Sequence, residues 1–538
     1  MMKKLFTIVV LLWGMTTIHS QWNPNTAQNL LVTDPGESGF AFSERMSDGK
    51  TYIAFWKEVG APTNFELWLQ ILDQNGNKQL GNNGILISNQ IPMGTYIASE
   101  RTAVDSSDNL YIGLSGTENN SAYIFKITPQ GTSVWPNGIN IGQGYTPEIL
   151  PLSNGDIIAS YQPLNQEYAK VQRFSAGGQP VWASPIEIMT DDLTKNTAPA
   201  DLFELPNNEF EIIFHQVDTG IYSHLFAQKL NFDGTILWNT PKQILTKGTN
   251  IVNRYSGVVD GNAVYYGLSV SENFRFDAYL QRINSDGSLP WGADGVDFDV
   301  NETNYEMGLK VSHTPNSPYI WAISQYSNPS QTQNGEYVQK FDKQTGARLL
   351  TDNAKQVFPI DSTNMYHIGD LHLINDNPFF VVQKKNDFND ESLNAVLLDN
   401  NGDFAWQQQY IPMATYPAEK SFVSSLKPIN GQNVIVFHEE KSTDANPVVY
   451  AQSLVLPTLG TDEVHANHSS VSIYPNPVAD IIHVKGVKDQ KFNIYNTVSQ
   501  SVKRGEIKQG KINVQDLSKG IYILKIGDQK EGYKFIKE

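Results

Sequence analysis

The chain has 538 residues, of which 40% are hydrophobic and 18% charged, so several domains or one large repetitive domain are expected and disorder is not. It contains no cysteine, which excludes disulfides, thiol nucleophiles and Cys-ligated zinc. The formal charge of −17 is uneven, because residues 471–538 carry 12 Lys/Arg and 7 Asp/Glu and the rest is strongly acidic, so we expect no nucleic-acid partner.

The first 20 residues have the pattern of an export signal. Lys3 and Lys4 precede a short apolar run at residues 5–13, and a plausible cleavage site follows at residues 18–20. That run is too short to span a bilayer, and no later segment approaches the roughly 20 apolar residues that a membrane helix needs. We therefore expect an exported protein without a transmembrane segment.

One turn pattern, exemplified by KLNFDGTILW at residues 229–238, recurs along the chain. Its glycine is found at Gly76, Gly131, Gly178, Gly234, Gly287, Gly346 and Gly402, at intervals of 47 to 59 residues. Alternating strand-like runs flank each turn, as in a β-hairpin. A repeat of this length is typical of a propeller blade or a solenoid unit.

A large apolar residue stands four positions after each glycine, namely Trp135, Trp182, Trp238, Trp291 or Trp406, and in two copies Leu80 or Leu350. Because these residues recur identically, we interpret them as packing wedges between units and not as a ligand platform. The repeated glutamines Gln70, Gln172, Gln228, Gln281, Gln339 and Gln452 are expected to form hydrogen bonds between or within units.

Four short strands per unit and little helical periodicity predict an all-β fold, an eight-bladed β-propeller with seven blades as the fallback. The last unit, residues 420–456, has three strands only, and residues 21–34 resemble the fourth strand and tail at 237–248, with Trp22 in the place of Trp238. We expect this N-terminal strand to complete the last blade, since an open ring would leave unpaired edges. The predicted propeller covers residues 21–457.

The turn TGARLL after Phe341 and Asp342 resembles the docking motif of eight-bladed quinoprotein dehydrogenases. Leu350 replaces the tryptophan of that motif, and the vicinal cysteine pair that many of those enzymes place beside the quinone is missing. The resemblance therefore concerns the fold of the body and not a cofactor, and we expect none.

After an expected linker at residues 458–470, a basic β-rich segment begins at residue 471. It carries, in order, Tyr474-Pro475-Asn476-Pro477, Gly520 and Tyr522 in one strand, and Lys534 and Lys537 near the end. This segment resembles the C-terminal sorting domain of the type IX secretion system of Bacteroidetes-type bacteria, although Ser499 stands where relatives usually have glycine. The resemblance implies a small β-sandwich-like domain that the translocon reads and a sorting peptidase cleaves, with the body released or anchored to the outer cell surface.

Residues at the ends of the second strands are candidates for ligand binding, because these ends gather on one face of a propeller. We single out Trp56, Tyr161, His215, Tyr326, Lys384, His438 and Glu439, whose aromatic and polar groups suit a glycan or a peptide. Ordinary solvated loop ends are the alternative. His215 and His438 lie half a ring apart, no metal-ligand spacing is present, and we predict neither a metal nor catalytic residues.

Three functions remain open on the sequence. The leading hypothesis is a secreted or surface-anchored propeller that binds a macromolecular ligand, either a glycan or a surface protein. A propeller-based glycan hydrolase or lyase is the second, because acids from different blades can meet in ways that the sequence does not reveal. The third is a structural scaffold of a surface apparatus.

Overall fold

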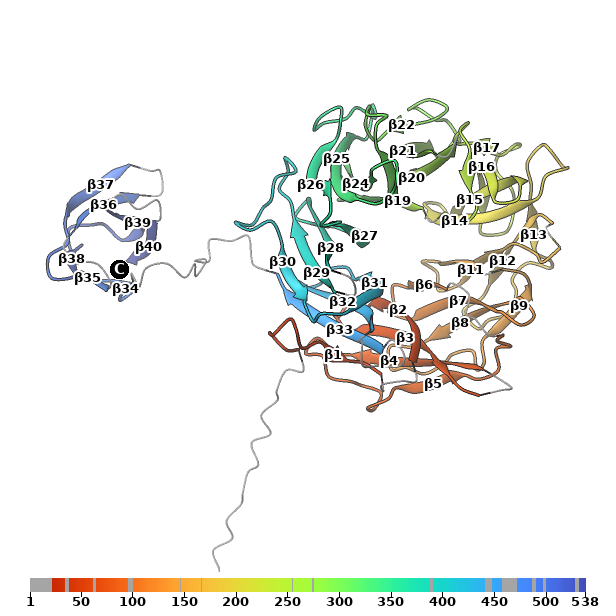
Figure 1. Ribbon diagram of the computed structural model, residues 1–538, viewed down its shortest axis with the longest axis horizontal. Coiled ribbons are helices and arrows are strands. Elements are labelled where there is room, and N and C mark those ends of the chain that lie inside the picture. Colours follow the sequence, from red (N-terminus) through yellow and green to blue (C-terminus); the bar gives the residue numbers. More distant parts are fainter. Residues whose placement is uncertain are drawn as a thin grey trace, which may run out of the picture. The chain divides into compact units, whose positions relative to one another are not determined.

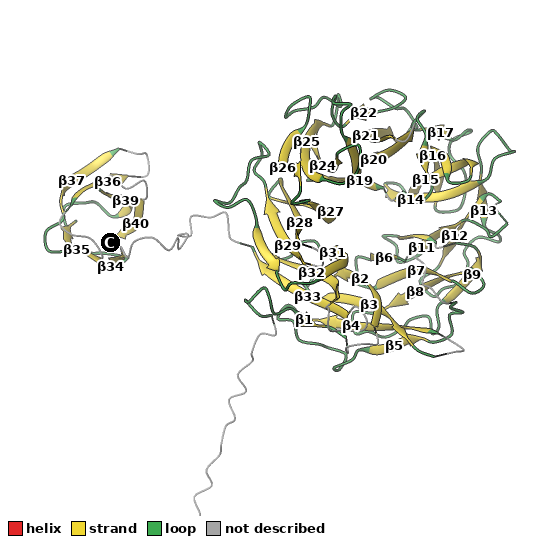
Figure 2. Ribbon diagram, in the orientation of Figure 1, coloured by secondary structure: helices red, strands yellow, loops and turns green. Residues whose placement is uncertain are grey.

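A computed structural model describes residues 22–33, 38–60, 64–94, 100–145, 147–165, 167–253, 255–272, 275–387, 390–440, 448–456, 472–485, 490–496, 500–527 and 532–538. The chain divides into two compact units, residues 1–457 and 458–538. All regular structure in these ranges is β-strand (Figure 2), which confirms the prediction of an all-β chain built from repeated four-stranded antiparallel units. The predicted signal peptide, the linker and Ser499 lie outside the described residues.

Eight antiparallel sheets occur in the described part of the first unit, and we number them in chain order. Sheet 1 contains β2 (Ser38–Arg45), β3 (Thr51–Glu58), β4 (Phe65–Leu72) and β5 (Ile85–Ser88). Sheet 2 contains β6 (Arg101–Val104), β7 (Leu110–Gly116), β8 (Ser121–Ile127) and β9 (Ile139–Gln143). Sheet 3 contains β10 (Glu148–Pro151), β11 (Ile157–Tyr161), β12 (Ala169–Phe174) and β13 (Ile186–Ile188). Sheet 4 contains β14 (Thr197–Leu205), β15 (Glu209–Thr219), β16 (Tyr222–Asn231), β17 (Lys242–Gln243) and the added β18 (Thr249–Asn250).

The remaining sheets of this unit follow the same order of strands. Sheet 5 contains β19 (Ser256–Asp260), β20 (Ala263–Glu272), β21 (Arg275–Asn284) and β22 (Val296–Asp297). Sheet 6 contains β23 (Tyr305–Ser312), β24 (Tyr319–Ser327), β25 (Asn334–Asp342) and β26 (Lys355–Asp361). Sheet 7 contains β27 (Tyr366–Ile374), β28 (Asn377–Asp387), β29 (Asp390–Leu397) and β30 (Ile411–Ala414), and sheet 8 contains β1 (Leu30–Leu31), β31 (Glu419–Ser425), β32 (Gln432–Glu440) and β33 (Val448–Val455).

The sheets of the first unit follow one another around a common centre, with their first strands innermost (Figure 1). The first strand of each sheet contacts the first strand of the next, and β31 of sheet 8 contacts β2 of sheet 1. The core lies between neighbouring sheets, since its clusters of buried apolar side chains combine strands of two successive sheets. Burying both faces of each sheet supplies the stability that this cysteine-free unit cannot take from disulfides.

The repeated tryptophans lie over the glycine turn of the following sheet. Trp182 of sheet 3 donates Nε1–H to the carbonyl of Phe232, two residues before Gly234 in sheet 4, at 3.1 Å. Trp135 and Trp238 make the same contact with the next turn, at 3.3 Å each. A methyl group added to Gly234, whose φ is +94°, would lie 2.9 Å from Ile186 Cδ1 and 3.1 Å from Trp182 Cε2. Only glycine fits this position without displacing its neighbours.

A second repeated contact ties each sheet to the next. The basic residue after the repeated glutamine reaches a turn carbonyl of the following sheet: Arg173 Nη1 to Phe232 O is 2.6 Å, Arg282 Nη1 to Lys343 O is 2.9 Å, and Lys340 Nζ to Asn400 O is 2.7 Å. The glutamines act both within and between sheets. Gln172 and Gln228 each donate to the carbonyl of the tryptophan that precedes the fourth strand of their own sheet, at 3.2 Å. Gln281 of sheet 5 also donates to the carbonyl of Ile244, which follows β17 of sheet 4, at 2.9 Å.

Sheet 8 is assembled from both ends of the unit. Leu30 and Leu31 of β1 pair with Ala451 and Tyr450 of β33, and Gln452 Nε2 donates to the carbonyl of Asn23 at 3.2 Å. Trp22 donates Nε1–H to the carbonyl of Gln74 at 2.8 Å and lies against Gly76 of sheet 1. Trp22 therefore makes the contact that Trp182 makes between sheets 3 and 4.

The C-terminal unit consists of two small sheets. One contains β34 (Ser472–Tyr474), β35 (Ile481–Lys485) and β38 (Lys511–Asn513), and the other β36 (Lys491–Asn496), β37 (Ser501–Glu506), β39 (Gly520–Ile526) and β40 (Gly532–Lys537). Both contribute to a single cluster of buried apolar residues that includes Ile482, Ile512, Phe492, Leu524 and Phe535. Two sheets that share one core make a small sandwich.

The contact over the glycine turn can be tested by replacing Gly234 with alanine. We expect Gly234→Ala to lower the free energy of unfolding by about 2–4 kcal/mol, about 1–2 from the left-handed backbone and the rest from overpacking against Trp182. Gly155→Ala is the matched control, because its φ is +89° and nothing lies within 4 Å of the added methyl group. Equal losses in the two variants, measured by urea denaturation, would mean that the tryptophan does not constrain the turn.

Candidate functional site

The three aromatic residues predicted to bind ligand are buried, and two of them are hydrogen-bonded to an acidic residue. Trp56 is 1% exposed and donates Nε1–H to Glu100 Oε1 at 2.6 Å. Tyr326 is 0% exposed, and its hydroxyl donates to Asp299 Oδ2 at 2.5 Å. Tyr161, at 6% exposure, packs its hydroxyl close to Gly142. These contacts give each residue a packing role, and ligand binding by them stays a prediction.

The two histidines are also buried. His215 Nδ1 lies 2.8 Å from Ser223 Oγ, and burial lowers the pKa of His215 to about 3. His438 Nε2 accepts a hydrogen bond from the backbone N–H of Ala41 at 2.8 Å, which fixes Nε2 as unprotonated, and burial lowers its pKa to about 4. Both imidazoles are therefore neutral at physiological pH, and neither lies free on a surface.

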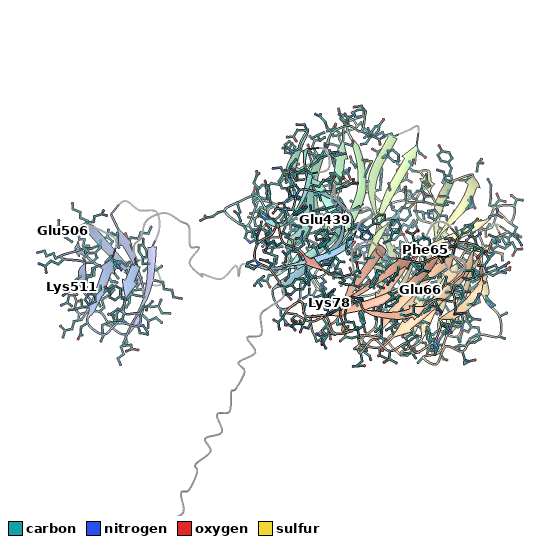
Figure 3. The ribbon with its side chains drawn as sticks, turned by 60° about the horizontal axis from the view of Figure 1, so that its bottom comes forward. Phe65, Glu66, Lys78, Glu439, Glu506 and Lys511 are labelled. Carbon is teal, nitrogen blue, oxygen red and sulfur yellow. The ribbon has the colours of Figure 1, made fainter. Side chains whose placement is uncertain are left out.

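The two charged candidates differ in exposure. Glu439, labelled in Figure 3, is 1% exposed; its Oε2 accepts a hydrogen bond from Asn29 at 2.9 Å and lies 3.7 Å from Lys420 Nζ. Lys384 is half-buried and donates to the hydroxyl of Tyr410 at 3.3 Å. Glu439 therefore helps to attach the N-terminal segment to sheet 8, and Lys384 alone among the seven has a partly exposed side chain.

A cleft lies among loops that are close in sequence to two of the candidates, Tyr161 and His215. This loop cleft has a volume of about 430 Å³ and is lined by Tyr145, Gln162, Thr194, Lys195, Asn196, Val217, Asp218, Gly220, Ile251 and Val252. The lining comes from the loops between sheets, from the β11–β12 loop, and from the end of β15 with the turn that follows it. Tyr145 and Val252 are 45% and 67% exposed, so an aromatic ring and an apolar side chain border a polar floor.

The charges in the loop cleft neutralise one another. Asp218 lies 3.4 Å from Lys195 Nζ and 2.6 Å from Nδ1 of His224. The other polar lining groups are the amides of Gln162 and Asn196 and the hydroxyl of Thr194. An exposed tyrosine beside amides, a hydroxyl and a paired carboxylate is a lining that suits a neutral, hydroxyl-rich ligand, which combines ring faces with many hydrogen-bonding groups.

A second cavity lies among the first strands of sheets 1, 2, 7 and 8. This inner cavity has a volume of about 590 Å³, and its lining includes Phe42, Ser43, Glu44, Arg45, Glu100, Arg101, Thr102, Val104, Gly369, Asp370, His372, Val423, Ser424, Ser425, Leu426 and Lys427. The lining is rich in ionisable groups of both signs. It is the first strands, and not the ends of the second strands, that bring them together.

Two carboxyl groups of the inner cavity have pKa values shifted in opposite directions. Burial raises the pKa of Glu44 to about 7, although the hydroxyl of Thr102 donates to it at 2.7 Å. Burial acts to raise the pKa of Asp370 as well, but Lys310, 2.9 Å away, outweighs it and leaves that pKa below its ordinary value. One group can therefore carry a proton near neutral pH while the other is a carboxylate, as in acid–base pairs.

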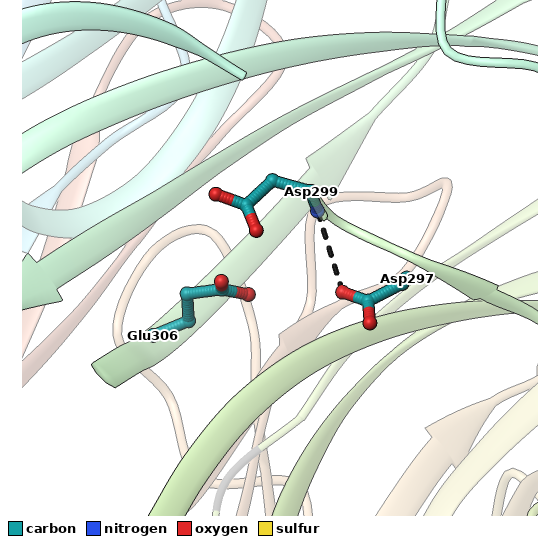
Figure 4. A group of neighbouring side chains, drawn as sticks. All are labelled: Asp297, Asp299 and Glu306. Atoms are coloured by element: carbon teal, nitrogen blue, oxygen red, sulfur yellow. Dashed lines mark hydrogen bonds between the residues drawn. The ribbon is translucent and has the colours of Figure 1, made fainter. Parts of the chain in front are cut away.

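Among the described residues, one cluster of acidic groups has a spacing that could hold a metal ion (Figure 4). Carboxylate oxygens of Asp297, Asp299 and Glu306 lie within 4.8 Å of one another. Burial and the neighbouring Asp299 raise the pKa of Glu306 well above its ordinary value. A proton on Glu306 removes part of the repulsion between the three groups.

Sequence reasoning came close to the loop cleft and missed its residues. It selected Tyr161 and His215, whereas the lining contains Gln162, one residue on, and Asp218, three residues on. Consecutive strand residues point to opposite faces, so a shift of one position along a strand exchanges a surface residue for a buried one. Tyr145 lies in a loop between sheets, where the pattern of repeats carries no signal.

The motifs of the C-terminal unit are joined in the structure. The amide of Asn476 donates to the carbonyl of Lys534 at 3.1 Å and accepts the N–H of Ile536 at 2.8 Å, so the Tyr-Pro-Asn-Pro motif is fastened to β40. Tyr522 stacks on Phe535 with ring centroids 5.6 Å apart. Lys537 Nζ donates to the carbonyl of Glu538 at 2.6 Å, and Tyr474 is 50% exposed. Pro475 and Pro477 follow β34, and Gly520 is the first residue of β39.

These C-terminal residues coincide with a known family. Residues 472–538 match the family model described as a secretion system C-terminal sorting domain. The C-terminal unit is therefore a sorting domain of type IX secretion, as its motifs predict, and the protein is exported and is either secreted or attached to the cell surface. In the described ranges there is no helix with the length and apolarity needed to cross a membrane.

No curated protein matches the chain. Among solved structures it is similar to a puromycin hydrolase, at 10% identity and a TM-score of 0.39, covering 78% of this chain and 61% of that one. It is also similar to polysaccharide lyase Uly1, at 12% identity, a TM-score of 0.40 and coverage of 79% and 91%. A third similarity is to the GH93 α-L-arabinofuranosidase of Fusarium graminearum, at 11% identity, a TM-score of 0.33 and coverage of 57% and 92%. The chain spans about three fifths of the puromycin hydrolase, and similarity at these scores does not establish a shared activity.

The raised pKa of Glu306 predicts how the stability of the protein depends on pH. Because its pKa is raised in the folded state, folded protein binds more protons than unfolded protein above about pH 5, and stability falls as the pH rises. Glu306→Gln removes this pH-dependent contribution to stability. The melting temperature of the variant minus that of the parent should therefore increase steadily between about pH 5 and 9. Glu187→Gln, at an exposed glutamate, is the control. A constant difference across this range would show that Glu306 is ionised in the folded protein.

Proposed function

We propose that the first unit is an eight-bladed β-propeller closed by its N-terminal segment, which type IX secretion delivers outside the cell to bind a macromolecular ligand. The blade number is supported by the eight sheets and by the contacts between their first strands. Closure is supported by the pairing of β1 with β33 and by Trp22, which makes the contact over Gly76 that tryptophans make elsewhere between successive sheets.

The observation that carries ligand binding is the loop cleft. It is assembled from loops, which tolerate the sequence change that recognition requires, and its wall presents exposed Tyr145 above neutral polar groups. A glycan is the ligand that this lining favours, since sugars offer an apolar ring face to an aromatic side chain and hydroxyl groups to amides and carboxylates. A surface protein that inserts a polar loop is the alternative ligand.

A glycan hydrolase or lyase is the second candidate, and one observation favours it. Glu44 and Asp370 line the same inner cavity, and their pKa values are shifted apart. A protonated carboxyl and a carboxylate are the two groups that glycosidic-bond cleavage employs. Release of reducing ends from a polysaccharide, lost in both Glu44→Gln and Asp370→Asn, would move this activity to first place.

Ligand binding at the loop cleft can be tested on a polysaccharide array with the mature chain, residues 21–538. We expect Tyr145→Ala to weaken binding by roughly 3- to 12-fold, the range for loss of one aromatic contact, and to leave stability unchanged. Tyr474→Ala, at a tyrosine that is 50% exposed on the other unit, is the control. Unchanged binding by Tyr145→Ala would remove the cleft from the proposal, and binding to no glycan would favour a protein ligand or a scaffold.

Closure by the N-terminal segment can be tested by replacing Trp22. Trp22→Ala removes the packing on Gly76 and the hydrogen bond to Gln74, and we expect a loss of about 3 kcal/mol in the free energy of unfolding. Trp182→Ala, which breaks the same contact between sheets 3 and 4, is the reference and should cost a similar amount. A negligible loss for Trp22→Ala alone would show that the ring does not depend on its N-terminal segment.

A further inference from the structure

The outer side of the larger sheet in the C-terminal unit carries three exposed isoleucines. Ile521 and Ile523 of β39 are 44% and 41% exposed, and Ile536 of β40 is 41% exposed, while the residues that alternate with them along both strands are buried. Ile521 pairs directly with Ile536, and Ile523 lies two residues farther along the same side of β39. The three side chains therefore form one apolar patch on the side of the sheet that faces away from the core.

Exposed cations border this patch. Lys534 of β40 pairs directly with Ile523, and Lys525 follows Ile523 by two residues on the same side of β39. Asn493 of β36 lies between Lys525 and Arg504 of β37, so the two cations stand in one row across the sheet. None of the three cations forms an ion pair among the described residues of this unit. We call the three isoleucines together with these three cations the isoleucine face.

The isoleucine face has an excess of positive charge. Among the described residues in the four strands of this sheet, the acidic residue on the same side is Glu506, which Figure 3 labels and which pairs directly with Lys491. Lys491 offsets that carboxylate, so the charge of the face itself is not neutralised. The C-terminal unit as a whole is also basic, with 12 Lys/Arg against 7 Asp/Glu in residues 471–538. A partner that covers this face must offer negative charge beside an apolar area.

The composition of the face favours a lipid surface over a protein. Protein interfaces are enriched in aromatic residues, methionine and arginine and are depleted of lysine, whereas segments that lie on membranes combine apolar side chains with lysine and arginine. Lysine suits a membrane because its hydrocarbon stem lies along the apolar layer while its ammonium group reaches the phosphates. We propose that the isoleucine face binds the C-terminal unit to an anionic membrane surface, with its isoleucines at the boundary of the apolar layer and its cations at the lipid phosphates.

This inference does not depend on the function proposed for the first unit. The loop cleft and the closure of the ring belong to residues 1–457, whereas the isoleucine face belongs to residues 458–538. A failure of membrane binding therefore leaves glycan binding intact, and the reverse also holds.

The test is sedimentation of the mature chain, residues 21–538, with lipid vesicles. One set of vesicles contains phosphatidylcholine alone, and the other contains equal parts of phosphatidylcholine and anionic phosphatidylglycerol. We expect the chain to bind the anionic vesicles and to bind the neutral ones at least roughly 10-fold more weakly. The acidic charge of the first unit opposes binding, but at about 0.1 M salt it is screened beyond about 10 Å, and it is the same in every variant.

The contribution of charge is tested by Lys525→Gln combined with Lys534→Gln. We expect this variant to bind anionic vesicles roughly 10- to 30-fold more weakly, because each lysine at an anionic surface adds to the attraction. Lys485→Gln combined with Lys511→Gln is the matched control, since both lysines are exposed on the other sheet and the net charge falls by the same amount (Figure 3 labels Lys511). The control should lose roughly 3-fold or less, and equal losses in the two variants would overturn the assignment to this face.

The contribution of apolar contact is tested by Ile536→Ser. We expect roughly 3- to 8-fold weaker binding to anionic vesicles, from the loss of one partly buried aliphatic side chain. Ile481→Ser is the matched control, because Ile481 is also 41% exposed and lies in β35 of the other sheet. Equal effects of these two substitutions, or no binding of the parent to anionic vesicles, would overturn the proposal and leave an acidic protein surface as the partner of this face.

Discussion

The contact on which the first unit depends is that of a large apolar side chain with the glycine turn of the next sheet. The tryptophan fills the space that a β-carbon would occupy, and in sheets 2, 3 and 4 its indole N–H satisfies the turn carbonyl two residues earlier. Packing and hydrogen bonding thus act at the same atoms, which fixes both the distance and the angle between neighbouring sheets. Where leucine replaces tryptophan, as at Leu80, the packing remains and the hydrogen bond does not.

The same contact explains why the indole N–H groups of two repeated tryptophans have no partner among the described residues. The turn of sheet 6 is one residue longer, with Gly346 N–H donating to Asp342 O, and Nε1 of Trp291 has no partner among the described residues. The described residues of sheet 8 end at Leu456, just after β33, and include no glycine turn there, and Nε1 of Trp406 is likewise without a partner among the described residues. Both deviations occur where the turn differs, as expected if the turn positions the acceptor.

Much of the fold could be predicted because its signal is local and repeated. The spacing of Gly234 and Trp238 is visible in one hairpin, and the likeness of residues 21–34 to a fourth strand predicts the contact that Trp22 makes. The residues that line the two cavities could not be predicted in this way. Whether Tyr161 or Gln162 faces a cleft depends on strand register, and the lining of the inner cavity combines Arg45 with Ser425 and Lys427, which are almost 400 positions away. Such a combination is visible only when distant strands are placed side by side.

The C-terminal unit shows the complementary case, in which a short motif contains its own tertiary contact. Asn476 bonds to β40 on both sides of Phe535, so the two motifs that identify the domain hold each other in place. The C-terminal unit has a cluster of buried apolar side chains of its own.

The pairing of β1 with β33 joins residues that are some 420 positions apart in the chain. Closing so long a loop is entropically expensive and slow, so this pairing is expected among the last events of folding. Sheet 8 therefore cannot form until both ends of the unit have been synthesised, and a truncation at either end removes a strand from the same sheet.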